Sequence, residues 1–178
     1  MFTLAKKDVE RYYMLCGRDK LSVTTFDVIK AFLGFKLTPV LLFRMSSFCY
    51  RKKIPVFDKI FSLINFVIFG VEIANNCWIG GGLFIPHSQG IVIGASSIGT
   101  SATIYQQVTL GATNIDIPFN YANRPKLGDN VVVASGAKVL GGIVIGNNVI
   151  IAANAVVTKS FGDDVILAGL PAKIIKRK

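Results

Sequence analysis

An aliphatic residue returns every six positions through much of the second half of the chain. Near the C-terminus the repeat falls on Leu127, Val133, Val139, Ile145, Ile151 and Val157. The positions four residues later hold small or aliphatic side chains, namely Val131, Ala137, Ile143, Val149 and Ala155. The same spacing joins Ile73, Ile79, Ile85 and Ile91, then slips and continues through Ile98, Ile104 and Leu110. Neither a helix nor an alternating strand has this period, whereas a hexapeptide repeat does.

Each six-residue unit supplies one short strand and one corner, and three units complete a turn of a triangular solenoid. The aliphatic residue fills the interior, and small residues let the backbone turn the corner. An antiparallel barrel, the alternative, has no reason to keep a period of six. The pattern therefore predicts a mainly β fold, a parallel β-helix over residues 71–178 whose coils stack at about 4.8 Å. Residues 113–126 interrupt the repeat and predict an inserted loop, a common place for functional residues on a rigid scaffold.

Residues 1–70 follow a helical pattern instead. Thr24 precedes Asp27 by three positions, as in a capping box. One face of the helix that follows carries Phe26, Ile29, Phe32 and Leu33. Two further helices are expected near residues 40–51 and 57–69. The chain is thus predicted to have a small N-terminal helical region, a β-helix domain and a basic C-terminal tail.

Composition narrows the class of protein. Hydrophobic residues make up 52% of the 178 positions and charged residues 17%, which excludes a disordered chain. The longest uncharged apolar run, residues 60–71, is too short for the ~20 residues that cross a bilayer. The N-terminus does not resemble a signal peptide. Cys16, Cys49 and Cys77 are odd in number and far apart, which favours free thiols and a cytoplasmic location.

The net charge of +10 is uneven, with +7 in residues 1–70 and +3 in residues 71–178. A basic helical region with apolar faces is compatible with peripheral contact with the anionic inner face of a membrane. Alternatively, the helices cap the open first coil of the solenoid. No helix-turn-helix, zinc or RNA-recognition pattern is present, so we do not expect a nucleic-acid partner.

Three segments resemble the hexapeptide-repeat acyltransferases: HSQGIVIG at residues 87–94, YQQVTLGAT at 105–113 and AGLPAKII at 168–175. They are most similar to the serine O-acetyltransferase-like branch, and within it to O-acetyltransferases of polysaccharide and capsule biosynthesis. The resemblance implies a left-handed parallel β-helix, a homotrimer, and acetyl-CoA as co-substrate in the groove between neighbouring solenoids.

The resemblance assigns a catalytic role to His87, the single histidine of the chain. Histidine is suited to remove a proton from an acceptor hydroxyl near neutral pH, although a lone histidine can also be structural. Glu72, fifteen residues earlier, matches the position where the family carries an aspartate that orients the histidine. One histidine per chain does not provide the three zinc ligands of a hexapeptide carbonic anhydrase, so no metal is expected.

For acetyl-CoA, the resemblance implies backbone contacts at Ala112, Thr113, Ser135 and Ala153, where small side chains allow close approach. Lys173, within the third motif, is expected to meet the nucleotide phosphates.

The acceptor site departs from the serine-specific pattern. Pro86 stands where an aspartate usually precedes the histidine, and the loop reads Asn123-Arg124 in place of Arg-His. Tyr121 beside Asn123 and Arg124 would suit stacking and hydrogen bonding to a sugar ring, unless the aromatics only anchor the loop. The favoured prediction is therefore transfer of acetyl to a sugar hydroxyl in bacterial surface polysaccharide assembly. The alternatives are L-serine acetylation for cysteine synthesis and a non-catalytic scaffold.

Overall fold

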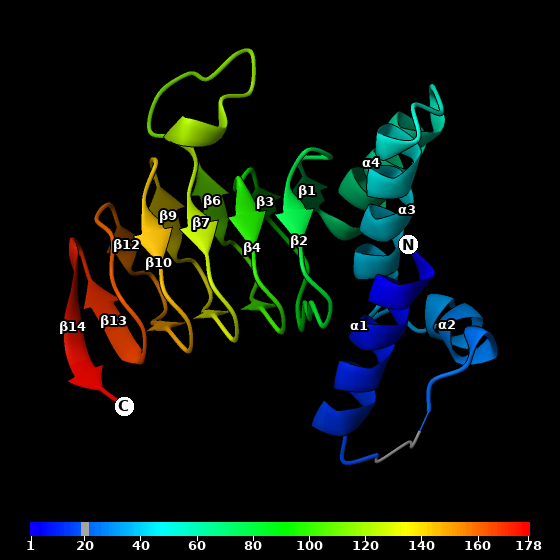
Figure 1. Cartoon of the computed structure of the whole chain (residues 1–178), viewed down its shortest axis with the longest axis horizontal. Helices are drawn as coiled ribbons and strands as arrows, with labels where there is room; N and C mark the ends of the chain where they lie inside the picture. The colour runs from blue at the N-terminus through cyan, green and yellow to red at the C-terminus, as the bar shows by residue number, and fades with distance from the viewer. Residues whose placement is uncertain (19–21) are drawn as a thin grey trace.

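A cluster of helices leads into a parallel β-helix in the computed structural model, which describes residues 1–18 and 22–178. The helices gather at one end of the solenoid, and the strands follow one another toward the C-terminus (Figure 1). The helices are α1 (Phe2–Leu15), α2 (Thr25–Phe32), α3 (Thr38–Arg51) and α4 (Phe57–Phe69). The strands form three faces, as expected when three six-residue units complete a coil.

The first face, ordered β1-β3-β6-β9-β12, consists of Val71–Ile73, Ile91–Ile93, Thr109–Gly111, Lys138–Leu140 and Val156–Val157. The second, ordered β2-β4-β7-β10, consists of Trp78–Ile79, Ser97–Ile98, Lys126–Leu127 and Val144–Ile145. The third, ordered β5-β8-β11-β13-β14, consists of Thr103–Ile104, Val132–Val133, Ile150–Ile151, Val165–Gly169 and Ala172–Arg177. Pairing is parallel except between β13 and β14, which form an antiparallel hairpin at the far end.

The six-residue repeat confirms its predicted role, because all of its aliphatic positions are buried. Leu127 is 4% exposed and Ile145 1%, while Val133, Val139, Ile151 and Val157 are fully buried. Burying such side chains removes roughly 1.5–3 kcal/mol of unfavourable hydration each, which is the main stabilisation of a solenoid. The coils stay closely stacked because glycines stand where backbone meets backbone. A Cβ added at Gly99 would lie 2.6 Å from the carbonyl of Gly128.

The slip in the repeat has a local origin. Ile73 pairs with Ile93, and Ile93 with Leu110, so the residue in phase is Ile93 rather than Ile91. Eight positions separate Ile85 from Ile93, whereas six separate Ile104 from Leu110. The corner at residues 86–90 is therefore two residues longer than the corner of the next coil, and it is the corner that carries His87.

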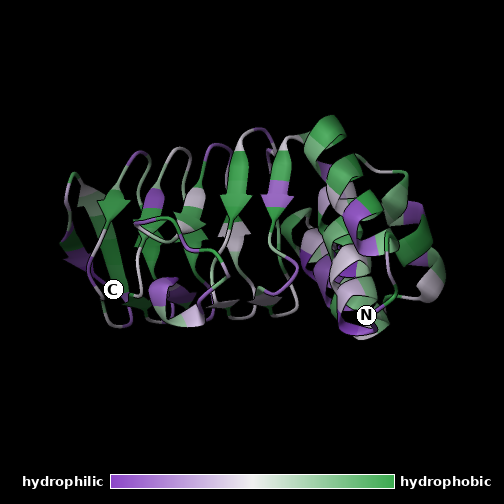
Figure 2. Cartoon of the chain, turned by 90° about the horizontal axis from the view of Figure 1, so that it is seen from above, coloured by the Kyte–Doolittle hydropathy of each residue, from purple (hydrophilic) through white to green (hydrophobic). Residues whose placement is uncertain are grey.

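The helical region covers the open end of the first coil. Val40, Leu42 and Phe43 of α3 and Phe69 of α4 join the same buried cluster as the solenoid interior. The predicted capping box is present, since the Thr24 side chain accepts from the Asp27 amide. Figure 2 shows the helices seated against one end of the strands.

The apolar face predicted for the second helix is not buried, however. Phe26, Ile29 and Leu33 are mostly exposed, because α2 turns Val28 toward the core instead. In the part of the chain that the structure describes, no helix is long and apolar enough to cross a bilayer. Peripheral membrane contact stays a prediction.

Candidate active site

His87 borders a cleft between the helical region and the lengthened corner of the solenoid. The cleft has a volume of about 410 Å³. Phe35, Lys36 and Pro39 line it from the helical side, and residues 85–89 and Gln106 line it from the solenoid. The imidazole is exposed, and its ring centroid lies 6.5 Å from that of Tyr105. An accessible imidazole in a cleft of this size can exchange a proton with a small bound molecule.

The strand register places His87 in a row that runs along one corner of the solenoid. Phe84 bridges Thr103, Thr103 pairs with Val132, and Val132 pairs with Ile150. Counting three residues onward from each of these positions gives His87, Gln106, Ser135 and Ala153. Hydrogen bonds from the Gly136 amide to Gln106 O and from the Asn154 amide to Ser135 O tie successive corners together. The structure thus brings Ser135 and Ala153 onto the same corner as His87.

The remaining residues predicted to contact acetyl-CoA lie elsewhere. Ala112 and Thr113 follow β6, at the corner on the other side of the first face. Lys173 lies on β14 and lines a second cleft of about 320 Å³ near the C-terminus, together with Lys159 and Phe161. This second cleft has two ammonium groups on its walls.

Glu72 is exposed on the outer side of β1, where it pairs in register with Val92. Among the residues that the structure describes, no hydrogen bond or ion pair joins Glu72 to His87. The orienting role of Glu72 stays a prediction.

The inserted loop is organised around Asp116 and projects from the side of the solenoid (Figure 1). Arg124 Nε donates to Asp116 Oδ2 at 2.7 Å, and its guanidinium lies 3.8 Å from the centre of the Phe119 ring. Arg124 Nη1 also donates to Gly94 O at 3.0 Å, and Asn123 Nδ2 donates to Asp116 Oδ1 at 3.2 Å. Burial raises the pKa of Asp116, but these donors outweigh it, and the pKa falls below its ordinary value.

Tyr121 contacts the same cluster, with its ring edge-on to Phe119 at 5.1 Å between centroids, and remains half exposed. The loop is therefore anchored by its own aromatic and charged groups, as in the alternative considered for it. Its predicted substrate residues, Tyr121, Asn123 and Arg124, do not line the His87 cleft of their own chain.

Two residues of the cleft were not identified from the sequence. Lys36 Nζ donates to the carbonyl of Pro86 at 2.9 Å, next to His87. Gln106 Oε1 is buried and accepts no hydrogen bond from the described residues. Gln106 lies inside the YQQVTLGAT motif, but nothing in that motif separates it from Gln107, and Lys36 has no sequence signal.

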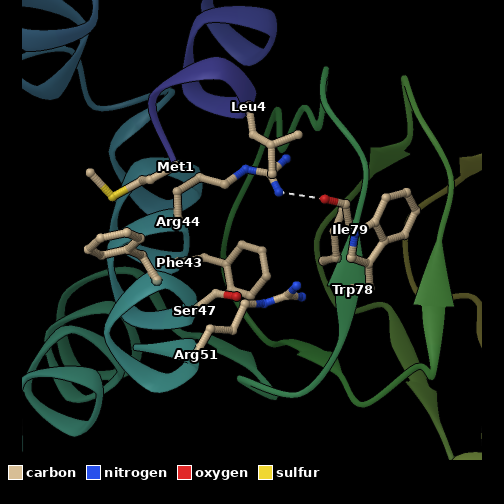
Figure 3. A pocket seen from close by; sticks show the side chains of 9 residues that line it. Met1, Leu4, Phe43, Arg44, Ser47, Arg51, Trp78 and Ile79 are labelled. Carbon is tan, nitrogen blue, oxygen red and sulfur yellow. Dashed lines mark hydrogen bonds between the residues drawn. The ribbon is translucent and has the colours of Figure 1, made fainter. Parts of the chain in front are cut away.

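Other candidate chemistry is weaker. The described residues contain no group of three or more His, Cys, Asp or Glu side chains arranged to hold a metal ion. Burial raises the pKa of the Cys77 thiol to about 12, so this side chain is not a thiolate nucleophile. A smaller cavity of about 150 Å³ lies where helices meet the first coil, and there Arg44 donates to Ile79 O (Figure 3).

Known proteins share both the repeat and the overall structure. A family model described as bacterial transferase hexapeptide (six repeats) matches residues 124–159. Serine acetyltransferase of Synechococcus elongatus is 37% identical over 167 residues, which are 93% of this chain and 66% of that protein. Serine acetyltransferase of Staphylococcus xylosus is 37% identical over 178 residues, which are 99% of this chain and 80% of that protein.

A crystal structure extends the likeness to three dimensions. It is that of serine acetyltransferase in complex with coenzyme A from Brucella abortus strain S19, with a TM-score of 0.78 and 26% identity. The match covers 98% of this chain and 67% of that one.

The six-residue coils define the class of protein, the left-handed β-helices of the hexapeptide-repeat acyltransferases. Within this class, the chain belongs to the serine acetyltransferase family. The predicted left-handed fold and the acyltransferase class are confirmed.

The predicted sugar acceptor and the role in surface polysaccharide assembly are wrong, because the relatives that match nearly the whole chain are serine acetyltransferases. That prediction gave too much weight to Pro86, Asn123 and Arg124. Arg124 forms an ion pair with Asp116 within its own loop, so the presence of this arginine in the sequence does not indicate which class of acceptor the protein binds.

Proposed function

We propose that this protein transfers the acetyl group of acetyl-CoA to the hydroxyl of L-serine, with His87 as the general base. The observation that carries the proposal is the place of His87 at an enlarged corner, on a cleft, in a chain of the serine acetyltransferase family. The relative from Brucella abortus that shares this fold was crystallised with coenzyme A, which supports the choice of donor.

The reaction needs one proton acceptor and no covalent enzyme intermediate. His87 takes the proton of the serine hydroxyl as the oxygen attacks the thioester carbonyl carbon. The tetrahedral intermediate then collapses, the carbon–sulfur bond breaks, and the imidazolium returns its proton to the departing thiolate. The products are O-acetylserine and free CoA. Cys77 does not compete as a nucleophile because its thiol is buried and protonated.

The donor is proposed to lie along the corner that continues from His87. Ser135 and Ala153 lie along this corner and have small side chains, so the pantetheine arm can approach the backbone there. Lys159 and Lys173 supply positive charge at the far cleft for the nucleotide phosphates. Ala112 and Thr113 lie at a neighbouring corner, where they would serve a donor bound between two solenoids. That arrangement fits the homotrimer implied by the family resemblance, and sedimentation or light scattering measures it directly.

Glu72 is proposed to orient the imidazole once substrates are bound, although the two side chains do not contact one another in this structure. The three cysteines are free thiols, which supports action in a reducing compartment such as the cytoplasm.

The test is release of CoA thiol by the purified protein supplied with acetyl-CoA and L-serine, or with a panel of sugars and nucleotide sugars. We expect turnover with L-serine, lost by roughly 10²–10⁴-fold in His87→Asn. Calorimetry should show that His87→Asn still binds acetyl-CoA. Turnover confined to a sugar would refute the serine proposal. Serine turnover that survives His87→Asn would refute the assigned base. Acetyl-CoA binding without turnover of any acceptor would instead indicate a scaffold.

A further inference from the structure

We propose that Lys36 and Gln106 recognise the two ends of the amino-acid acceptor, Lys36 the carboxylate and Gln106 the ammonium. This inference rests on the proposed function, because it assigns the binding groups for L-serine in the His87 cleft. Neither residue belongs to the loop or to the position before His87, where the sequence comparison with the family had placed amino-acid recognition.

Lys36 brings a positive charge to the edge of the cleft. Its ammonium donates to Pro86 O at 2.9 Å, and this bond uses one of its three donors. The side chain is otherwise exposed and lines the cleft from the helical side. The remaining donors can meet a carboxylate that enters beside His87, and a charge-assisted hydrogen bond of this kind is stronger than a neutral one.

Gln106 brings an unpaired acceptor to the same cleft. Its side-chain oxygen is buried and accepts no hydrogen bond from residues 1–18 or 22–178. A buried acceptor without a partner is unfavourable, so binding of a ligand that supplies a donor is favoured. The terminal amide torsion of glutamine is soft, which lets the oxygen turn toward a bound donor.

Among the described residues of the cleft, a neutral side-chain oxygen is the available partner for an ammonium. None of the described residues that line the cleft is Asp or Glu, and Pro86 stands directly before His87. The strand register places Gln106 one coil above His87, a spacing of about 4.8 Å. The cleft therefore presents a cation, a base and a hydrogen-bond acceptor, which match the carboxylate, hydroxyl and ammonium of L-serine.

The experiment compares three acceptors with acetyl-CoA as donor: L-serine, L-serinamide, which lacks the carboxylate, and 3-hydroxypropanoate, which lacks the ammonium. In Lys36→Met, kcat/KM for L-serine should fall roughly 10- to 100-fold while that for L-serinamide stays unchanged. In Gln106→Met, the same loss should affect L-serine and L-serinamide but spare 3-hydroxypropanoate. The KM for acetyl-CoA should not change in either variant.

Matched controls separate recognition from folding. Lys30→Met and Gln107→Met make the same substitutions at exposed residues outside the cleft and should leave all three acceptors unaffected. If a Met variant unfolds, Gln106→Glu tests the same site. A carboxylate there should increase the preference for L-serine over 3-hydroxypropanoate, and Lys36→Arg should retain the preference for L-serine over L-serinamide.

Equal losses for all three acceptors, or no loss, would overturn this inference and leave serine acetylation intact. A wild-type protein that binds acetyl-CoA but acetylates none of the three would overturn the proposed function together with it.

Discussion

Asp8 of α1 and Arg44 of α3 form a buried ion pair, with 2.9 Å between Asp8 Oδ2 and Arg44 Nε. The pair extends into the solenoid, because Asp8 Oδ1 also accepts from the amides of Gly82 and Leu83 at 2.8 Å. Arg44 in turn donates to the carbonyls of Ile79 and Gly80. Burial raises the pKa of the Asp8 carboxyl, and these hydrogen bonds act against the shift. The pair fixes the helices to the first coil just before the corner that carries His87.

Removing one member of this ion pair should lower the free energy of unfolding substantially. Asp8→Asn leaves the Arg44 charge buried without its counterion, and we expect a loss of about 3–5 kcal/mol in the free energy of unfolding. Urea titration followed by circular dichroism measures it. Glu10→Gln, an exposed acid on the same helix, is the control and should change stability by less than about 0.5 kcal/mol. If Asp8→Asn changed the free energy of unfolding as little as the control does, the pair would not be what holds the helices in place.

If Glu72 orients His87 in the complex, its charge matters more than its length. Glu72→Gln should lower kcat roughly 10- to 100-fold and change the pH profile of kcat, since an oriented imidazole loses its anionic partner. Glu72→Asp should restore most of the rate. Equal rates for the wild type and Glu72→Gln would assign Glu72 to the solvated surface of β1.

The order of the inserted loop should depend on the charge of Asp116. Because the pKa of Asp116 is lowered in the folded chain, its contribution is complete above the unfolded-state value of about 3.9. The contribution is lost as the pH falls from there through the lower folded-state pKa. The protection factors of loop amides, which compare each exchange rate with the intrinsic rate at the same pH, should therefore fall below about pH 4 in the wild type.

Asp116→Asn should show the lower protection factors already at neutral pH, because Arg124 then lacks its counterion. Amides in the solenoid corners serve as the internal reference. Unchanged loop protection in Asp116→Asn would mean that the Phe119 stack alone holds Arg124.

The three thiols should differ in reactivity. Cys16 is exposed, whereas Cys77 is fully buried and its pKa is raised to about 12. Iodoacetamide at about pH 8 should alkylate Cys16 first and leave Cys77 unmodified until the chain unfolds, as mass spectrometry can show. Cys77→Ala should keep its acetyltransferase activity. Rapid labelling of Cys77 in the folded protein would contradict the burial on which its exclusion as a nucleophile depends.

Much of the fold was readable from the sequence because a solenoid is built from local units. A period of six identified Leu127, Val133 and their equivalents as interior positions, and each lies where it was predicted. The repeat predicts the slip after Ile91, whereas the structure places the extra residues before it, at residues 86–90. Ile91 and Ile93 are both buried, and the sequence does not show which of them pairs with Ile73. The face of α2 was also misassigned, because amphipathic spacing identifies a stripe but not the partner that covers it.

In the candidate site, too, some residues could be identified from the sequence and others could not. His87 was identified from the sequence because it is the single histidine and stands in a motif of the family. Arg124 was expected to face a ligand, yet it binds Asp116, eight residues away in a loop whose path has no repeat to define it.

The sequence by itself determined the coil and its interior, because both depend on neighbours within one or two repeats, and its family motif singled out His87 as the candidate base. Only the tertiary structure decided which groups surround that base. Lys36 reaches Pro86 across fifty positions, and Gln106 reaches the cleft through the stacking of one coil on the next. Such contacts depend on how the helices seat against the solenoid end, and the packing of the whole chain sets that geometry.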